Sequence, residues 1–162
     1  AFGAGLPVVP VTTLEAMALQ VLERHSGRAI ACLDARMGEV YWGCYAADAA
    51  RGLIAAGAPR VGPPDSVVLP GPGCWPGGVP GGEAAGAGVR GIGRGFSAYP
   101  DLAERLGVQL DEQRSRALPN AREIALLGAR RLITGGGLDP AELQPLYLRD
   151  KVALTEAERA AK

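Results

Sequence analysis

The sequence has few of the residues from which self-sufficient active sites are built. It contains one histidine, His25, and three cysteines, none of which form a Cys-x-x-Cys pair. One histidine cannot supply the paired ligands of a helical zinc protease, and this cysteine spacing argues against a zinc site or a disulfide framework. No serine lies in a Gly-x-Ser-x-Gly elbow. We therefore predict no catalytic residue and no metal site, and we interpret His25 as a structural residue near a helix end.

The sequence also lacks an excess of charge of either sign and a long apolar run. Lys and Arg together number 17, as do Asp and Glu, whereas tight unaided binding to nucleic acid requires a basic surplus. No stretch approaches the ~20 apolar residues that span a bilayer, and the start has no basic signal-peptide region. These absences favour a cytoplasmic protein without a membrane segment. Residues 1–5 are typical of a helix end, so we expect that preceding residues are missing.

The residues that are present follow patterns typical of an α/β domain, and hydrophobic residues make up 48% of the chain. An apolar run at 6–11, bounded by breaking residues, predicts a buried strand. Thr12 and Glu15 then have the spacing of a capping box, so we expect a helix to begin there. Runs at 29–34 and 40–45, separated by a Met-Gly turn, predict a hairpin.

Later segments predict further strands at 59–62 and 89–93 and a short helix at 101–106. Asn120 and Glu123 have the spacing of a second capping box, which predicts a longer helix. The spacing of the small and apolar positions in this helix predicts one buried face, formed by Ala121, Ile124, Ala125, Gly128 and Leu132. Because consecutive strands are followed by helices, we predict a mixed sheet.

Residues 70–88 form a compositionally biased insertion. Glycine and proline occupy 12 of these 19 positions, and such a segment cannot sustain a helix or a strand ladder. We predict a loop or a disordered insertion. Its glycines do not indicate a phosphate-binding loop, because no Lys-Ser/Thr pair follows them.

Charged residues gather around the predicted hairpin turn. Asp34, Arg36 and Glu39 flank it, and they fit either a surface or interface ion pair or an acid–base dyad. Asp34 also stands where actin-like nucleotide folds hold phosphate or metal, but this turn has one glycine and no hydroxyl. Tyr147 and Arg149 form a second cluster, in which Tyr147 either faces a partner or packs the last segment onto the sheet. We predict that these five residues face a partner or a nucleotide.

Four segments, in order along the chain, resemble motifs of the bacterial TsaB (formerly YeaZ) family. The most specific is the nonapeptide at 34–42, Asp-Ala-Arg-Met-Gly-Glu-Val-Tyr-Trp. The others lie at 6–15, 93–100 and 145–153, and Phe96 stands where the family has tryptophan. The family's first strand with Asp-Thr-Ser/Ala and its Gly-Pro-Gly-Ser-Phe-Thr-Gly-x-Arg segment are absent. The chain therefore resembles the family without most of its N-terminal lobe.

The resemblance implies an α/β fold of the actin-like ATPase (ASKHA) type, of which this chain holds mainly the second lobe. On that basis residues 1–27 are the end of the N-terminal lobe, made of a strand and a helix. Residues 28–153 are the C-terminal lobe with the Gly/Pro-rich insertion at 70–88, and residues 154–162 are a polar tail.

The resemblance further implies a non-catalytic subunit of the complex that makes threonylcarbamoyladenosine in tRNA. Such a subunit supports the threonylcarbamoyl transferase TsaD together with the ATPase TsaE, and it meets tRNA through the complex. This function implies no cofactor bound by the chain alone, with ATP or ADP placed at the complex interface, and it leaves a homodimer open. The alternative hypothesis is an enzyme, either an actin-like-fold ATPase or a glycoprotease-type protein.

Overall fold

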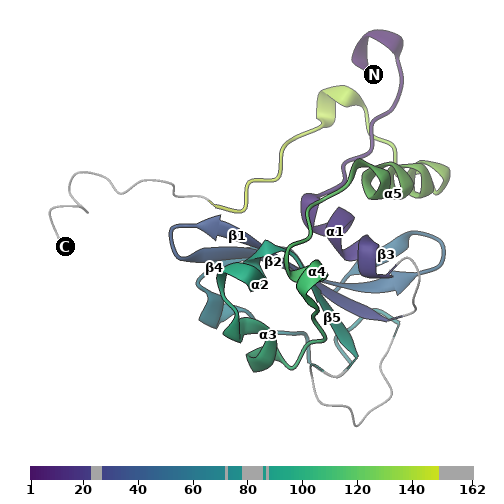
Figure 1. Ribbon diagram of the computed structural model, residues 1–162. Helices are drawn as coiled ribbons and strands as arrows, with labels where there is room; N and C mark the ends of the chain where they lie inside the picture. The colour runs from purple at the N-terminus through teal and green to yellow at the C-terminus, as the bar shows by residue number, and fades with distance from the viewer. Residues whose placement is uncertain (23–26, 72, 78–85, 87, 150–162) are drawn as a thin grey trace, which may run out of the picture.

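The computed structural model describes residues 1–22, 27–71, 73–77, 86 and 88–149 (Figure 1). The predictions about His25 and about the tail at 154–162 fall outside these residues. A five-stranded sheet lies at the centre, in the order β3-β2-β1-β5, with β4 also paired to β2. The strands are β1 (Arg28–Arg36), β2 (Glu39–Asp48), β3 (Gly52–Ala55), β4 (Arg60–Gly62) and β5 (Val89–Ile92).

The sheet is mixed, as the order of elements predicts. β1 and β2 form the expected antiparallel hairpin, and β5 runs parallel to β1. β3 and β4 both pair antiparallel with β2, at opposite ends of that strand. β4 and β5 confirm the strands expected at 59–62 and 89–93. β3 has no counterpart among the predicted strands, because its four residues are too few to show an alternating pattern.

Helices cover both faces of the sheet. α1 (Thr13–Leu22) lies against β1 and β2 on one face, and α5 (Ala121–Ile133) packs on α1 and β3. α2 (Arg94–Ala98) and α3 (Asp101–Leu106) lie on the other face (Figure 1). None of the helices in the described ranges is long and apolar enough to cross a bilayer. The short helices are α4 (Glu112–Ser115) and the 3-10 turns η1 (Phe2–Ala4), η2 (Pro64–Ser66) and η3 (Pro140–Glu142).

The alternation of side chains along β1 divides the core into two clusters. Ala29 and Ala31 belong to the cluster beneath α1, whereas Ile30 and Cys32 belong to the cluster that contains Phe96 of α2. Because both faces of this strand are covered, its sequence is a nearly continuous apolar run and not an alternating one. That pattern is why the sequence predicts a buried strand here.

The first predicted capping box is confirmed at the start of α1. The Thr12 backbone N–H donates to Glu15 Oε2 at 2.8 Å, and the Glu15 backbone N–H donates to Thr12 Oγ1 at 3.2 Å. Two N–H groups that the helix itself cannot satisfy are thereby paired. The local sequence alone fixes where this helix begins.

α5 differs from the sequence prediction in its cap and in its buried face. Asn120 makes no side-chain hydrogen bond with the helix start, and Glu123, which should complete the cap, is buried at 4% exposure. The side turned to the core carries Glu123 and Leu127, whereas Ile124 and Leu132 of the predicted face are exposed. Apolar residues occur around much of α5, so periodicity does not decide which face is buried, and packing against α1 does.

The prediction of a strand at 6–11 is wrong. This segment forms one isolated bridge, in which Val8 exchanges backbone hydrogen bonds of 3.0 and 2.8 Å with Leu138. Pro7 and Pro10 have no N–H group to donate, so a longer ladder cannot form on both sides of Val8. The segment is therefore extended but does not join the sheet.

The Gly/Pro-rich insertion is a loop in its described part, with no helix or strand among those residues. It is nevertheless anchored to the core by Trp75, which is 3% exposed. The indole N–H of Trp75 donates to the Pro70 carbonyl at 3.1 Å, and the Arg28 guanidinium lies 5.4 Å from the ring centre. The composition of the insertion does not reveal this anchor, since it depends on a pocket made by β1 and its neighbours.

Alanine substitutions at two helical glycines, Gly95 and Gly128, should change the stability of the protein in opposite directions. A Cβ atom on Gly95 of α2 would collide with the Cys32 side chain and approach its backbone, whereas a Cβ atom on Gly128 of α5 would meet nothing within 4 Å. We expect Gly95→Ala to lower the free energy of unfolding by about 1–3 kcal/mol through overpacking. We expect Gly128→Ala to raise it by about 0.5–1 kcal/mol through helix propensity. Urea unfolding followed by circular dichroism measures both, and changes of the same sign would contradict this packing.

The three cysteines should react at different rates. Cys32 and Cys44 are buried and Cys74 is exposed, and desolvation raises the pKa of both buried thiols from 9.0 to about 12. We expect one fast-reacting thiol with Ellman's reagent in the native protein at pH 8, and three in denaturant. Because unfolded thiols ionise near pH 9 and the buried ones do not, stability should fall as the pH rises from 9 towards 12. A second fast native thiol would contradict the burial.

Candidate partner-binding groove

An open groove of about 1040 Å³ lies between the two terminal segments of the described chain. Residues 9–14 form one wall and residues 143–149 form the other. Leu33 of β1, Tyr41 of β2, Pro59 and Ile124 of α5 complete the lining. The lining is mainly apolar and partly exposed, which is typical of a surface that binds another molecule.

The segment at 143–149 has no helix or strand and is held at its end by contacts that we call the Arg149 clamp. Nη2 of Arg149 donates to Glu39 Oε2 at 2.5 Å and to the Ala35 carbonyl at 3.0 Å. The guanidinium carbon lies 5.7 Å from the centre of the Tyr41 ring. The planar guanidinium can meet a carboxylate, a carbonyl and an aromatic face together. The clamp thus joins the C-terminal wall of the groove to the β1–β2 hairpin.

Asp34 and Arg36 form a separate pair inside the hairpin turn. Asp34 Oδ1 accepts the Arg36 backbone N–H at 2.9 Å, and Oδ2 lies 3.5 Å from Arg36 Nη1. Arg36 and Met37 have φ angles of 62° and 57°, a left-handed conformation that non-glycine residues adopt at a cost. The Asp34 carboxylate therefore stabilises a strained turn. The Arg36 side chain itself is 88% exposed.

The structure divides the five predicted site residues into three groups. Glu39 and Arg149 come together in the clamp, and Asp34 pairs with Arg36. Tyr147 lines the groove and is 79% exposed, so it does not pack the last segment onto the sheet. That any of the five contacts a partner stays a prediction.

The groove also uses apolar residues that the sequence did not single out as site residues. Leu143 and Leu146 line it from the C-terminal segment, and both are exposed. Ile124 was expected in the core but lines the groove instead. Such exposed apolar residues look like core residues in a sequence, so only the tertiary structure identifies them.

Ionisable groups with strongly shifted pKa values lie in the core and not in the groove. Burial raises the pKa of Tyr45 above its ordinary value, and the nearby Glu15 carboxylate acts in the same direction. Across the described ranges, no three His, Cys, Asp or Glu side chains are grouped as metal ligands would be. The groove is an open surface feature with a mainly apolar lining.

The sequence is similar to curated bacterial proteins along most of its length. It is 30% identical over 154 residues to the tRNA threonylcarbamoyladenosine biosynthesis protein TsaB of Escherichia coli. The aligned region covers 94% of this chain and 62% of that protein. The protein of the same name from Haemophilus influenzae is 27% identical over 160 residues, and the aligned region covers 94% of this chain and 61% of that protein. No family model matches the chain.

Two solved structures from Pseudomonas aeruginosa have the same fold. YeaZ has a TM-score of 0.69 at 30% identity, over 91% of this chain and 62% of its own. A protein described as similar to peptidase YeaZ has a TM-score of 0.71 at 31% identity, over 92% of this chain and 62% of its own. This chain is similar to the TsaB (YeaZ) proteins over most of its own length. The family resemblance and the α/β, actin-like fold class are confirmed, and the chain spans about 62% of the length of these relatives.

Three of the four TsaB-like segments meet at the groove. The segment at 34–42 forms the hairpin tip with Tyr41, the segment at 6–15 supplies one wall, and the described part of the segment at 145–153 supplies the other. The fourth segment, at 93–100, forms α2 and packs on the opposite face of β1. Residues from three of the segments that prompted the TsaB resemblance thus line one surface feature.

The Arg149 clamp can be tested by Arg149→Gln, with Arg36→Gln as the matched control. The first change removes a charged donor from Glu39 and Ala35, whereas the second removes an exposed charge from the same hairpin. We expect Arg149→Gln to lower the free energy of unfolding by about 1–3 kcal/mol and to shift the Tyr41 ring proton resonances. Arg36→Gln should change the free energy of unfolding by no more than about 0.5 kcal/mol, and it should leave the Tyr41 resonances at their native positions. Equal effects of the two changes would contradict the clamp.

Proposed function

We propose that this chain is a non-catalytic subunit of a tRNA threonylcarbamoyladenosine modification complex. In this function it supports a TsaD-type transferase, works with a TsaE-type ATPase, and meets tRNA in the cytoplasm through the assembled complex. Its TsaB relatives are named as tRNA threonylcarbamoyladenosine biosynthesis proteins. The observation that carries the proposal is that three TsaB-like segments converge on one exposed apolar groove.

The chemistry of the groove supports protein binding. Exposed apolar side chains line the groove, from Ile124 of α5 and from the C-terminal segment, and further ones lie at the end of α5. Contiguous exposed apolar surface marks interaction sites, and tyrosine and arginine are enriched at their centres and edges. The large apolar side chains that are exposed on α5 and at 143–147 are those of Ile124, Leu132, Ile133, Leu143, Leu146 and Tyr147.

We propose that the chain itself performs no chemistry and that any ATP or ADP binds where it meets its partners. Both carboxylate oxygens of Asp34, the residue placed where actin-like folds hold phosphate, are engaged by Arg36. A carboxylate used in this way stabilises its own turn and is not directed at a ligand. ATP hydrolysis by the purified chain that is lost in Asp34→Asn would overturn this part of the proposal.

Binding to the partner can be tested with Leu146→Glu and a matched control, Val68→Glu. Both leucine and valine are more than half exposed, but only Leu146 lines the groove. We expect the chain to bind a TsaD-type transferase of the same organism at micromolar concentration, and Leu146→Glu to weaken the affinity at least about tenfold by placing a charge in the interface. Val68→Glu should bind normally. Isothermal titration calorimetry provides the affinities.

Three results would contradict this function. The first is no complex at micromolar concentration, and the second is equal weakening by the two changes. The third is a concentration-dependent homodimer in light scattering that Leu146→Glu abolishes, because the groove would then be occupied by a second copy. Both variants alter exposed positions, so they should retain the stability of the parent chain.

A further inference from the structure

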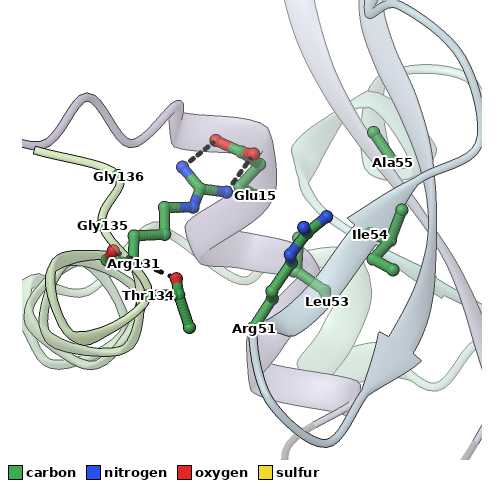
Figure 2. Close-up of a pocket in the computed structure, with 9 residues that line it drawn as sticks. All are labelled: Glu15, Arg51, Leu53, Ile54, Ala55, Arg131, Thr134, Gly135 and Gly136. Atoms are coloured by element: carbon green, nitrogen blue, oxygen red, sulfur yellow. Dashed lines mark hydrogen bonds and ion pairs between the residues drawn. The ribbon is translucent and has the colours of Figure 1, made fainter.

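A second cavity, of about 360 Å³, shares no lining residue with the groove (Figure 2). It is bounded by the first turn of α1, the start of β3 and the end of α5. Figure 2 shows Arg131 reaching from α5 to Glu15, and Arg51 rising from the start of β3. The lining residues beside these three are Leu53, Ile54, Ala55, Thr134, Gly135 and Gly136.

Arg131 is held rigidly in one wall of the cavity. Its Nη2 pairs with Glu15 Oε1 at 2.5 Å and its Nη1 donates to the Pro10 carbonyl at 2.8 Å. Both side chains of the ion pair are largely buried, and Glu15 is itself fixed by the capping box with Thr12. Within the described residues, the hydrogen bonds of Arg131 use only Nη1 and Nη2. Its Nε–H is left for a ligand.

Arg51 supplies an uncommitted guanidinium to the same cavity. Only its backbone N–H is engaged, with Asp48 Oδ1 at 2.6 Å, and its side chain has no hydrogen bond or ion pair within the part of the chain that the structure describes. Arg130 does not line the cavity, although its Nη1 would lie 2.7 Å from a Cβ atom on Gly52, the residue after Arg51. Two guanidinium groups therefore line the cavity, those of Arg51 and Arg131, and Arg131 is paired with Glu15.

The end of α5 does not compete for these guanidinium groups. The carbonyls of Arg130 and Arg131 accept hydrogen bonds from the backbone N–H groups of Thr134 and Gly136, at 3.2 and 2.7 Å. The Thr134 hydroxyl also donates to both carbonyls. The helix C-terminus, which would otherwise attract cations, is already capped. The lining holds two guanidinium groups, from Arg51 and Arg131, and one carboxylate, from Glu15, so it carries a net positive charge.

We propose that this cavity binds a small oxyanion, a phosphate or carboxylate group of a small molecule, between Arg51 and Arg131. Guanidinium groups suit such ligands because their planar array of N–H donors matches two oxygens at once. The Glu15 partner keeps Arg131 in position, and Arg51 closes on the anion from the mouth of the cavity. This site is separate from the groove, so it does not depend on the proposed subunit function.

The proposal can be tested by titrating the isotope-labelled chain with inorganic phosphate, and separately with acetate, at constant ionic strength in chloride. We expect saturable shifts of the arginine Nε–H resonances and of the backbone amides at 51–55 and 131–136. Arg51→Gln should weaken the phosphate affinity about tenfold, the loss expected when one charged donor group is removed. The two ligands distinguish a phosphate site from a carboxylate site by their relative affinities.

Arg94→Gln is the matched control, since Arg94 is exposed on α2 and lies outside the cavity. It removes the same charge and should leave the affinity unchanged. Linear, unsaturating shifts with both anions, or equal weakening by the two variants, would overturn the proposal, because either result indicates general screening of positive charge. Arg51 is exposed, so its replacement should preserve the fold, whereas replacing Arg131 would leave Glu15 without its partner.

Discussion

The carboxylate of Glu15 connects two parts of the chain that are distant in sequence, the N-terminal segment at 10–15 and the end of α5. It accepts the Thr12 N–H to cap α1, it pairs with Arg131 at the end of α5, and Arg131 in turn donates to the Pro10 carbonyl. The interaction orients α5 against α1 at its last turn. Since the ion pair is largely buried, either partner alone would be an uncompensated charge, so the two parts must assemble together. Pro10 of this junction lines the groove, whereas Glu15 and Arg131 line the cationic cavity.

Two arginines perform the same structural task at different places. Arg131 reaches from α5 to a carboxylate and a main-chain carbonyl of an earlier segment, namely Glu15 and Pro10. Arg149 reaches from the C-terminal segment to Glu39 and Ala35 in the same way. In each case the fork of the guanidinium fixes an irregular segment that has few backbone hydrogen bonds of its own. The two walls of the groove are held in place by side chains and not by the sheet.

The local parts of the fold could be predicted, and the parts that depend on packing could not. The Thr12–Glu15 cap, the β1–β2 hairpin and the mixed sheet follow from residue spacing over a few positions. The strand expected at 6–11 fails because Pro7 and Pro10 cannot donate to a ladder, although its apolar pattern fits a strand. The prediction of the buried face of α5 is wrong for a different reason. Several sides of this helix are apolar, and only the contact with α1 selects the side that is buried.

The candidate site was partly visible in the sequence, through the hairpin residues Asp34, Arg36 and Glu39, the cluster of Tyr147 and Arg149, and the motifs that resemble TsaB. That Arg149 contacts Glu39, that Asp34 stabilises its own turn and that Ile124 faces a groove became known from the packed structure. The difference comes from distance along the chain. Capping and turn interactions join residues three or four positions apart and leave a sequence pattern, whereas ion pairs across more than a hundred positions depend on how the helices pack.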